Sequence, residues 1–136
     1  MRTVIVGMDV LLTECTECNR KSDSVAQLIE YLQRNDVKSG VVMNDSDGKE
    51  TVKLSQLFDY QLEDLSEIIA TKKSYYVDNC PERLVAAGQL GWIPVYIFCN
   101  KCPENLEFKK FRSLSEFHTF LIQEKFEALQ MSNSMG

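Results

Sequence analysis

The cysteines of this chain have the spacing of metal ligands. Cys15 and Cys18 form one Cys-x-x-Cys pair near the N-terminus, and Cys99 and Cys102 form a second pair near the C-terminus. Two such pairs are typical of a tetrahedral four-sulfur site, for which zinc is the usual occupant. Four protein ligands leave no open position for water, so the pattern predicts a structural zinc site if the fold brings the two pairs together.

The same cysteines allow two other interpretations. Cysteine is commonly buried as a small apolar residue, so Cys99 could simply end a buried strand. The fifth cysteine, Cys80, precedes Pro81 at an expected helix N-terminus, where thiols tend to be reactive. It could act as a nucleophile, as a redox sensor or as an additional zinc ligand. A redox function predicts reversible oxidation within the two Cys-x-x-Cys pairs.

Length and composition predict one domain. The chain has 136 residues, of which 44% are hydrophobic, and this suits a single core in residues 1–130 followed by a flexible tail, residues 131–136. No segment approaches the run of roughly 18 apolar residues that a membrane-spanning helix needs, and the first residues resemble a strand instead of a signal peptide. Five cysteines without a secretory signal suit a reducing compartment. We therefore expect a cytoplasmic or nuclear protein.

The charge pattern argues against nucleic acid as a partner. The net charge is −5, and the basic residues are scattered among acidic ones instead of forming a stripe. Without such a stripe the chain has no general attraction to a phosphate backbone. We expect a protein partner, and neither a nucleic acid nor a membrane.

Apolar, β-branched runs alternate with helical patterns along the chain, which predicts an α/β fold with a mainly parallel sheet covered by helices on both faces. The expected strands are residues 3–8, 38–43, 74–77 and 92–98. The expected helices begin after residues 22–24, cover most of 49–72, run from Pro81 to about Gly88, and run from a capping box at Ser113 to about Leu129. The second of these helices would bury Leu62, Leu65, Ile68 and Ile69 on one face.

Two segments combine a strand with acidic residues at its end. Their sequences are Val-Ile-Val-Gly-Met-Asp-Val-Leu-Leu at residues 4–12 and Val-Asp-Asn-Cys-Pro-Glu-Arg at residues 77–83. Both resemble motifs of the haloacid dehalogenase (HAD) superfamily, phosphatases and relatives built on a doubly wound, Rossmannoid sheet. The first segment is similar to the first motif, a strand followed by Asp-x-Asp-Gly-x-Leu, and the second is similar to the fourth motif, acidic residues followed by Ser-Pro-Glu-Asn. The resemblance covers residues 3–121 and implies a capless, single-domain, three-layer HAD-like fold.

The departures from the family pattern bear on chemistry. The family's first aspartate attacks phosphorus to form an aspartyl-phosphate, and Gly7 stands at that position. Asp9 matches the second aspartate, the family's general acid and base, whereas Met43 replaces the hydroxyl residue of the second motif. No lysine falls where the third motif requires one. Of the magnesium-binding acids only Asp78 is kept, followed by Asn79, which leaves one clear carboxylate ligand.

The resemblance also suggests how the cysteines could meet. The family's sheet order places the strand that ends at Asp78 between the first strand and the strand that ends at Phe98, so the outer two lie about 10 Å apart. All five cysteines would then follow strands at the carboxyl edge, where open α/β sheets place their sites. The expected zinc ligands at this edge are Cys15, Cys18, Cys99 and Cys102, with Cys80 as an additional candidate.

Three functional hypotheses follow. The first is a non-catalytic pseudo-phosphatase, stabilised by structural zinc, that works as a binding or regulatory module in a protein complex. The alternative is a capless HAD-type phosphohydrolase in which Asp9 and Asp78 act with magnesium, and it predicts turnover that is lost in Asp78→Asn. The third is a thiol redox sensor.

Overall fold

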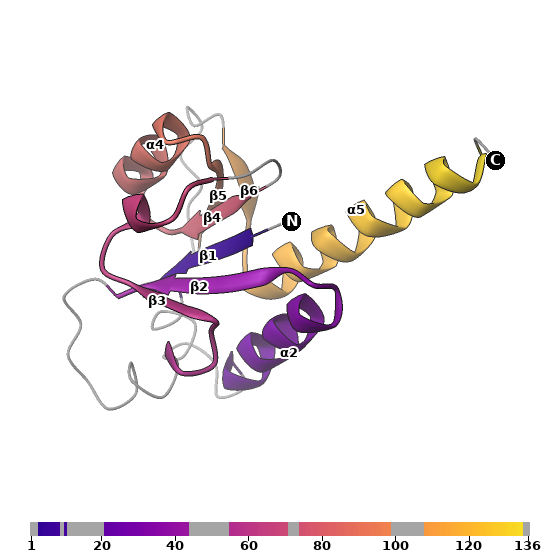
Figure 1. Ribbon diagram of the computed structural model, residues 1–136, viewed down its shortest axis with the longest axis horizontal. Helices are drawn as coiled ribbons and strands as arrows, with labels where there is room; N and C mark the ends of the chain where they lie inside the picture. The colour runs from indigo at the N-terminus through magenta and orange to yellow at the C-terminus, as the bar shows by residue number, and fades with distance from the viewer. Residues whose placement is uncertain are drawn as a thin grey trace.

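The computed structural model describes residues 3–8, 10, 21–43, 55–70, 74–98 and 108–134. These residues form an α/β fold with one six-stranded sheet and three α-helices (Figure 1). The strands are β1 (Thr3–Gly7), β2 (Lys38–Val42), β3 (Tyr60–Leu62), β4 (Tyr75–Asp78), β5 (Ile93–Ile97) and β6 (Lys109–Phe111). The helices are α2 (Lys21–Arg34), α4 (Pro81–Gln89) and α5 (Leu114–Ser134), with a short 3-10 helix, η1 (Leu65–Glu67).

The strand order across the sheet is β3-β2-β1-β4-β5-β6, and all five neighbouring pairs are parallel. The prediction that β4 lies between β1 and β5 is therefore confirmed. From β1 the chain adds strands first on one side and then on the other, so the order switches between β1 and β4. Open α/β sheets bind ligands beyond the carboxyl ends of the strands at such a switch. Here those ends are Gly7 and Asp78.

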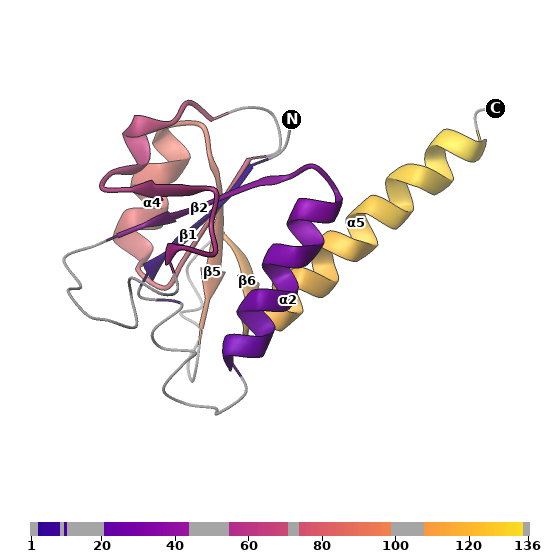
Figure 2. The ribbon, with the colours of Figure 1, turned by 60° about the horizontal axis from the view of Figure 1, so that its bottom comes forward.

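Helices lie on both faces of the sheet, and each face has its own core. Along β1, Val4 and Val6 belong to the core under α2 and α5, whereas Ile5 belongs to the core under α4, because successive strand residues face opposite sides. Figure 2 shows α4 on one side of the sheet and α2 with α5 on the other. Phe117 and Leu84 are fully buried representatives of the two cores.

Most of the expected elements are confirmed. The strands expected at residues 3–8, 38–43, 74–77 and 92–98 correspond to β1, β2, β4 and β5, and the helix after residues 22–24 is α2. Its four apolar residues at helical spacing are buried, and they are Val25, Leu28, Ile29 and Leu32. The helix from Pro81 is α4, which has proline in its first turn.

The helix expected over most of residues 49–72 is wrong for the part of this range that the structure describes. Strand β3 and the 3-10 helix η1 lie there instead. The side-chain amide of Gln61 donates to the backbone carbonyls of Ser55 and Phe58, at 2.7 and 2.9 Å, and so holds a turn before β3. Of the expected apolar face, Leu62 is buried but Ile69 is 87% exposed.

A capping box begins η1, which is a single turn long. The carboxylate of Asp64 accepts a hydrogen bond from the backbone N–H of Ser66, and the carboxylate of Glu67 accepts one from the backbone N–H of Asp64. This is a capping box, and Ile68 then returns to extended backbone. The helical spacing of the leucines and isoleucines therefore coincides with a strand and a capped turn.

The C-terminal region adds two differences. Strand β6, Lys-Lys-Phe, is a short, charged edge strand, a type that lacks the apolar run by which strands are predicted. Helix α5 continues to Ser134 instead of ending near Leu129, and its C-terminal half projects beyond the sheet (Figures 1 and 2). Of the helices that the structure describes, none is long and apolar enough to cross a membrane.

Candidate functional site

The carboxylate of Asp78 lies at the carboxyl end of β4 and is completely buried. Its Oδ2 atom accepts hydrogen bonds from the hydroxyl of Tyr76 at 2.5 Å and from Nε of Arg83 at 2.7 Å. Its Oδ1 atom accepts from the backbone N–H of Asn79 at 2.7 Å and from Nη2 of Arg83 at 3.2 Å. Both oxygens are therefore satisfied by donors from β4, the following turn and α4.

The negative charge of this carboxylate is balanced by a bidentate ion pair with the guanidinium of Arg83, whose side chain is 36% exposed. A buried carboxylate is tolerated when it is paired and hydrogen-bonded in this way. Burial raises the pKa of Tyr76, and the neighbouring Asp78 carboxylate raises it further. Tyr76 consequently keeps its proton at neutral pH and remains the donor in its hydrogen bond with Asp78.

A short turn after β4 positions these groups. Cys80 is the N-cap residue of α4, its side chain makes no capping hydrogen bond, and Pro81 begins the helix. The backbone N–H of Leu84 donates to the carbonyl of Cys80 at 3.1 Å, which closes the first helical turn. Because the turn is so short, Arg83 in this first helical turn reaches back to Asp78 at the strand end.

Gly7, at the end of the neighbouring strand β1, faces the same carboxylate. A Cβ atom placed on Gly7 would lie 2.8 Å from both Cγ and Oδ2 of Asp78 and 2.9 Å from its Oδ1. Contacts this short do not occur at real Cβ atoms, so the carboxylate of Asp78 occupies the volume that any side chain at position 7 would need. That position carries the nucleophile in the HAD pattern.

Magnesium does not fit Asp78 in this arrangement. A magnesium ion requires near-octahedral oxygen ligands, and both oxygens of Asp78 are already turned toward hydrogen-bond donors. Two of these four donors belong to the guanidinium of Arg83, whose positive charge would repel the ion. Asp9, the other residue of the predicted magnesium chemistry, lies outside the described residues.

The predicted zinc ligands Cys15, Cys18, Cys99 and Cys102 also lie outside the described residues. Of the five cysteines, Cys80 alone belongs to the described part, as a half-buried free thiol. No group of three or more His, Cys, Asp or Glu side chains that could hold a metal lies among the residues that the structure describes. The zinc site therefore stays a prediction.

Sequence reasoning missed Tyr76 and Arg83 as members of the site, although two signals pointed to them. Residues two apart on a strand share a face, so the Tyr-x-Asp spacing places Tyr76 beside Asp78. The side chain of an arginine in the first turn of the next helix is long enough to reach back to the end of the strand. Neither signal reveals that the carboxylate points toward Gly7.

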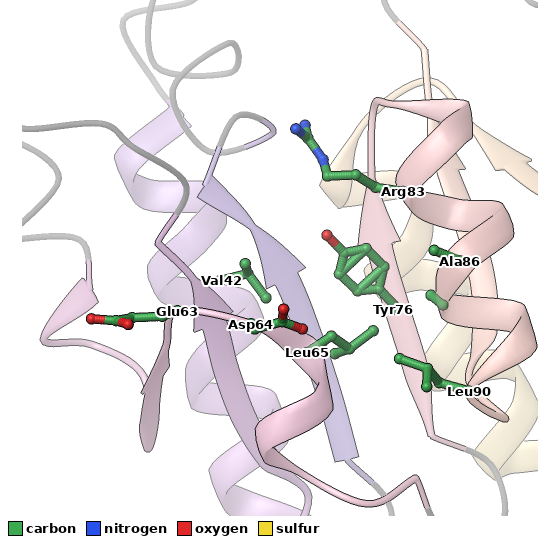
Figure 3. Close-up of a pocket in the computed structure, with 9 residues that line it drawn as sticks. Val42, Glu63, Asp64, Leu65, Tyr76, Arg83, Ala86 and Leu90 are labelled. Atoms are coloured by element: carbon green, nitrogen blue, oxygen red, sulfur yellow. The ribbon is translucent and has the colours of Figure 1, made fainter.

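A cavity of about 220 Å³ adjoins this cluster, between η1 and α4, and we refer to it as the η1–α4 cavity (Figure 3). Tyr76 and Arg83 line it and also bond to Asp78. The full lining consists of Val42, Glu63, Asp64, Leu65, Tyr76, Arg83, Ala86, Ala87 and Leu90.

No protein-family model matches the chain, and a search of curated proteins found no match. The functional interpretation therefore depends on the residues and the geometry of the site.

Proposed function

We propose that this chain is a non-catalytic, HAD-like pseudo-phosphatase that acts as a zinc-stabilised binding or regulatory module in a protein complex. The carboxylate of Asp78 carries this proposal, because it fills the volume of the missing side chain at position 7 and pairs with Arg83. The parallel sheet, with β1 between β2 and β4 and helices on both faces, is compatible with the three-layer, doubly wound fold of that superfamily.

The chemistry of nucleophilic phosphoryl transfer supports the same proposal. An attacking carboxylate needs a lone pair that is directed at the phosphorus atom. Gly7 has no such group, and the carboxylate that faces it, that of Asp78, directs its oxygens at four donors. The cluster therefore has the properties of a structural ion pair.

A phosphatase assay tests the non-catalytic part of the proposal. The purified chain is incubated with p-nitrophenyl phosphate and magnesium, beside Asp9→Ala, Asp78→Asn and, as a control for handling and charge, Asp36→Asn at an exposed turn. We expect no hydrolysis above the rate in buffer for any of the four proteins. Magnesium-dependent hydrolysis that is lost in Asp9→Ala or Asp78→Asn but kept in Asp36→Asn would show a remodelled phosphohydrolase instead.

The zinc part of the proposal is supported by the strand order. Strands β1 and β5 flank β4, and the described chain reaches Phe98, one residue before Cys99, at the carboxyl edge. Elemental analysis of untagged protein should give about one zinc per chain, lost in Cys15→Ser and in Cys102→Ser. Chelation should lower the melting temperature of the wild type but of neither variant. If the purified protein contains no zinc, the zinc part of the proposal is wrong, and the result favours unligated cysteines.

A further inference from the structure

We infer that the η1–α4 cavity receives one large apolar side chain of a partner protein, presented within a segment rich in lysine and arginine. This inference rests on the proposed function as a binding module and specifies the chemical properties of the partner. The residues of the cavity can be substituted without changing the predicted zinc ligands, so the inference can be tested separately.

The size of the cavity favours a single side chain. Small-molecule sites usually occupy about 300–1,000 Å³, whereas this cavity has about 220 Å³. Its walls are largely apolar, and Figure 3 shows Leu65 of η1 and Leu90, the C-cap residue of α4, facing each other across it, with the ring of Tyr76 between the two elements. A leucine, methionine or phenylalanine anchored in such a pocket is a common source of binding energy at protein interfaces.

The apolar surface of the cavity continues to an exposed side chain at its edge. Leu90 lines the cavity and is 51% exposed at the C-terminal end of α4. An exposed leucine beside an apolar cavity is a feature of interaction sites.

The charge at the cavity specifies the flanking residues of the partner. Glu63 and Asp64 are exposed acidic residues of the lining, and hydrogen bonds from Ser66 lower the pKa of Asp64, so its carboxylate is charged at neutral pH. Among the described residues that line the cavity, Arg83 is the basic one, and its charge is balanced by Asp78. The described lining is therefore net negative, which attracts basic segments and disfavours phosphate groups.

Fluorescence anisotropy with short synthetic peptides tests the inference. The probe peptide has a central phenylalanine flanked by lysine and arginine. One matched peptide has alanine at the centre, and the other has glutamate in both flanks. We expect the probe to bind at least about tenfold more tightly than either matched peptide.

Two substitutions locate the binding site. Ala86→Trp should fill the cavity and weaken binding of the probe at least about tenfold, whereas Ala26→Trp, at an exposed position of α2 on the other face of the sheet, should leave it unchanged. Asp64→Asn keeps an N-cap residue but removes the charge, and it should weaken binding about two- to fivefold. Its control, Asp36→Asn, should bind as the wild type does.

Thermal unfolding of each variant identifies any loss of fold. If Ala86→Trp does not fold, the change in probe binding of Asp64→Asn tests the inference instead. Absence of peptide binding, equal binding of the phenylalanine and alanine peptides, or equal effects of site and control variants would overturn the inference. Self-association that Ala86→Trp abolishes, without peptide binding, would assign the cavity to a second copy and would also overturn it. The zinc content and the phosphatase assay are independent of all these outcomes.

Discussion

Gly7 and Asp78 compete for one volume, and only Asp78 has a side chain to fill it. The carboxylate reaches this volume from the neighbouring strand and is held there by Tyr76, Asn79 and Arg83. Removing one partner of a buried ion pair is usually far more costly than the net stabilisation that the pair provides. The position of the carboxylate is therefore fixed by its neighbours as well as by the space above Gly7.

Substituting glycine by alanine at two positions measures the steric part of this arrangement. Gly7→Ala should lower the free energy of unfolding by about 1–3 kcal/mol, because its methyl group would overlap the Asp78 carboxylate. Gly88→Ala should instead raise it by about 0.5–1 kcal/mol, because Gly88 is within helix α4 and a Cβ there meets only Cγ of Pro94, at 3.7 Å. Urea unfolding of both variants gives the comparison, and equal shifts would contradict the overlap.

The sequence identified two members of the candidate site but not how they interact. The motif resemblance singled out Gly7 and Asp78. The apolar runs place both residues at strand ends, and the strand order implied by the resemblance makes these two strands neighbours. The direction of the carboxylate depends on Arg83 and Tyr76, which are remote from Gly7 in sequence. Such a direction results from three-dimensional packing and has no signature in residue spacing.

Helices α2 and α5 contact each other through an aromatic pair on one face of the sheet. The rings of Tyr31 and His118 have centroids 4.9 Å apart, and the Tyr31 hydroxyl donates to the carbonyl of Leu121 at 3.3 Å. Partial burial lowers the pKa of His118 from its ordinary value of 6.5. The folded chain therefore binds a proton at this position less readily than the unfolded chain does.

This pKa shift predicts a pH dependence of stability. A histidine with a depressed pKa stabilises the fold above pH 6.5, and this contribution is lost as the pH falls from 6.5 through the lower pKa of the folded form. Because the chain has a single histidine, His118→Gln should flatten the pH dependence of urea unfolding just below pH 6.5. Tyr31→Phe keeps the histidine and should retain the wild-type slope. An unchanged slope in His118→Gln would assign the effect to other groups.

Elements with a continuous apolar pattern could be predicted, and elements defined by polar side chains could not. Strands β1, β2, β4 and β5 and helices α2 and α4 bury regular sets of apolar residues. In contrast, the region of β3 and η1 is organised by the side chains of Gln61 and Asp64, which bond to nearby backbone groups. These contacts override a helical spacing of leucine and isoleucine that arises by coincidence.

Across the whole molecule, one sheet joins two cores that lie on opposite faces. Phe117 packs in the core under α5, and Trp92 packs in the core under α4. In a parallel sheet, the backbone of each residue is hydrogen-bonded to residues of the next strand whose side chains point to the opposite face. Loss of the core on one face should therefore weaken the whole sheet.

Phe117→Ala tests this coupling, with Trp92 as the reporter. The substitution empties a completely buried position and should lower the free energy of unfolding by about 3–5 kcal/mol. The urea midpoint measured by fluorescence of the single tryptophan should shift as far as the midpoint measured by circular dichroism. Ile122→Ala, at a residue of α5 that is 45% exposed, should move both midpoints little. A Trp92 midpoint that stays constant in Phe117→Ala would show that the two faces unfold separately.

The shared volume at Gly7 also has an evolutionary consequence. Substitution of Gly7 by aspartate in one step would place a second carboxylate in space that the Asp78 carboxylate already fills. Displacing Asp78 first would leave the guanidinium of Arg83 without its partner. Each order of substitutions passes through a less stable variant, so selection for stability alone would oppose the appearance of an aspartate at position 7.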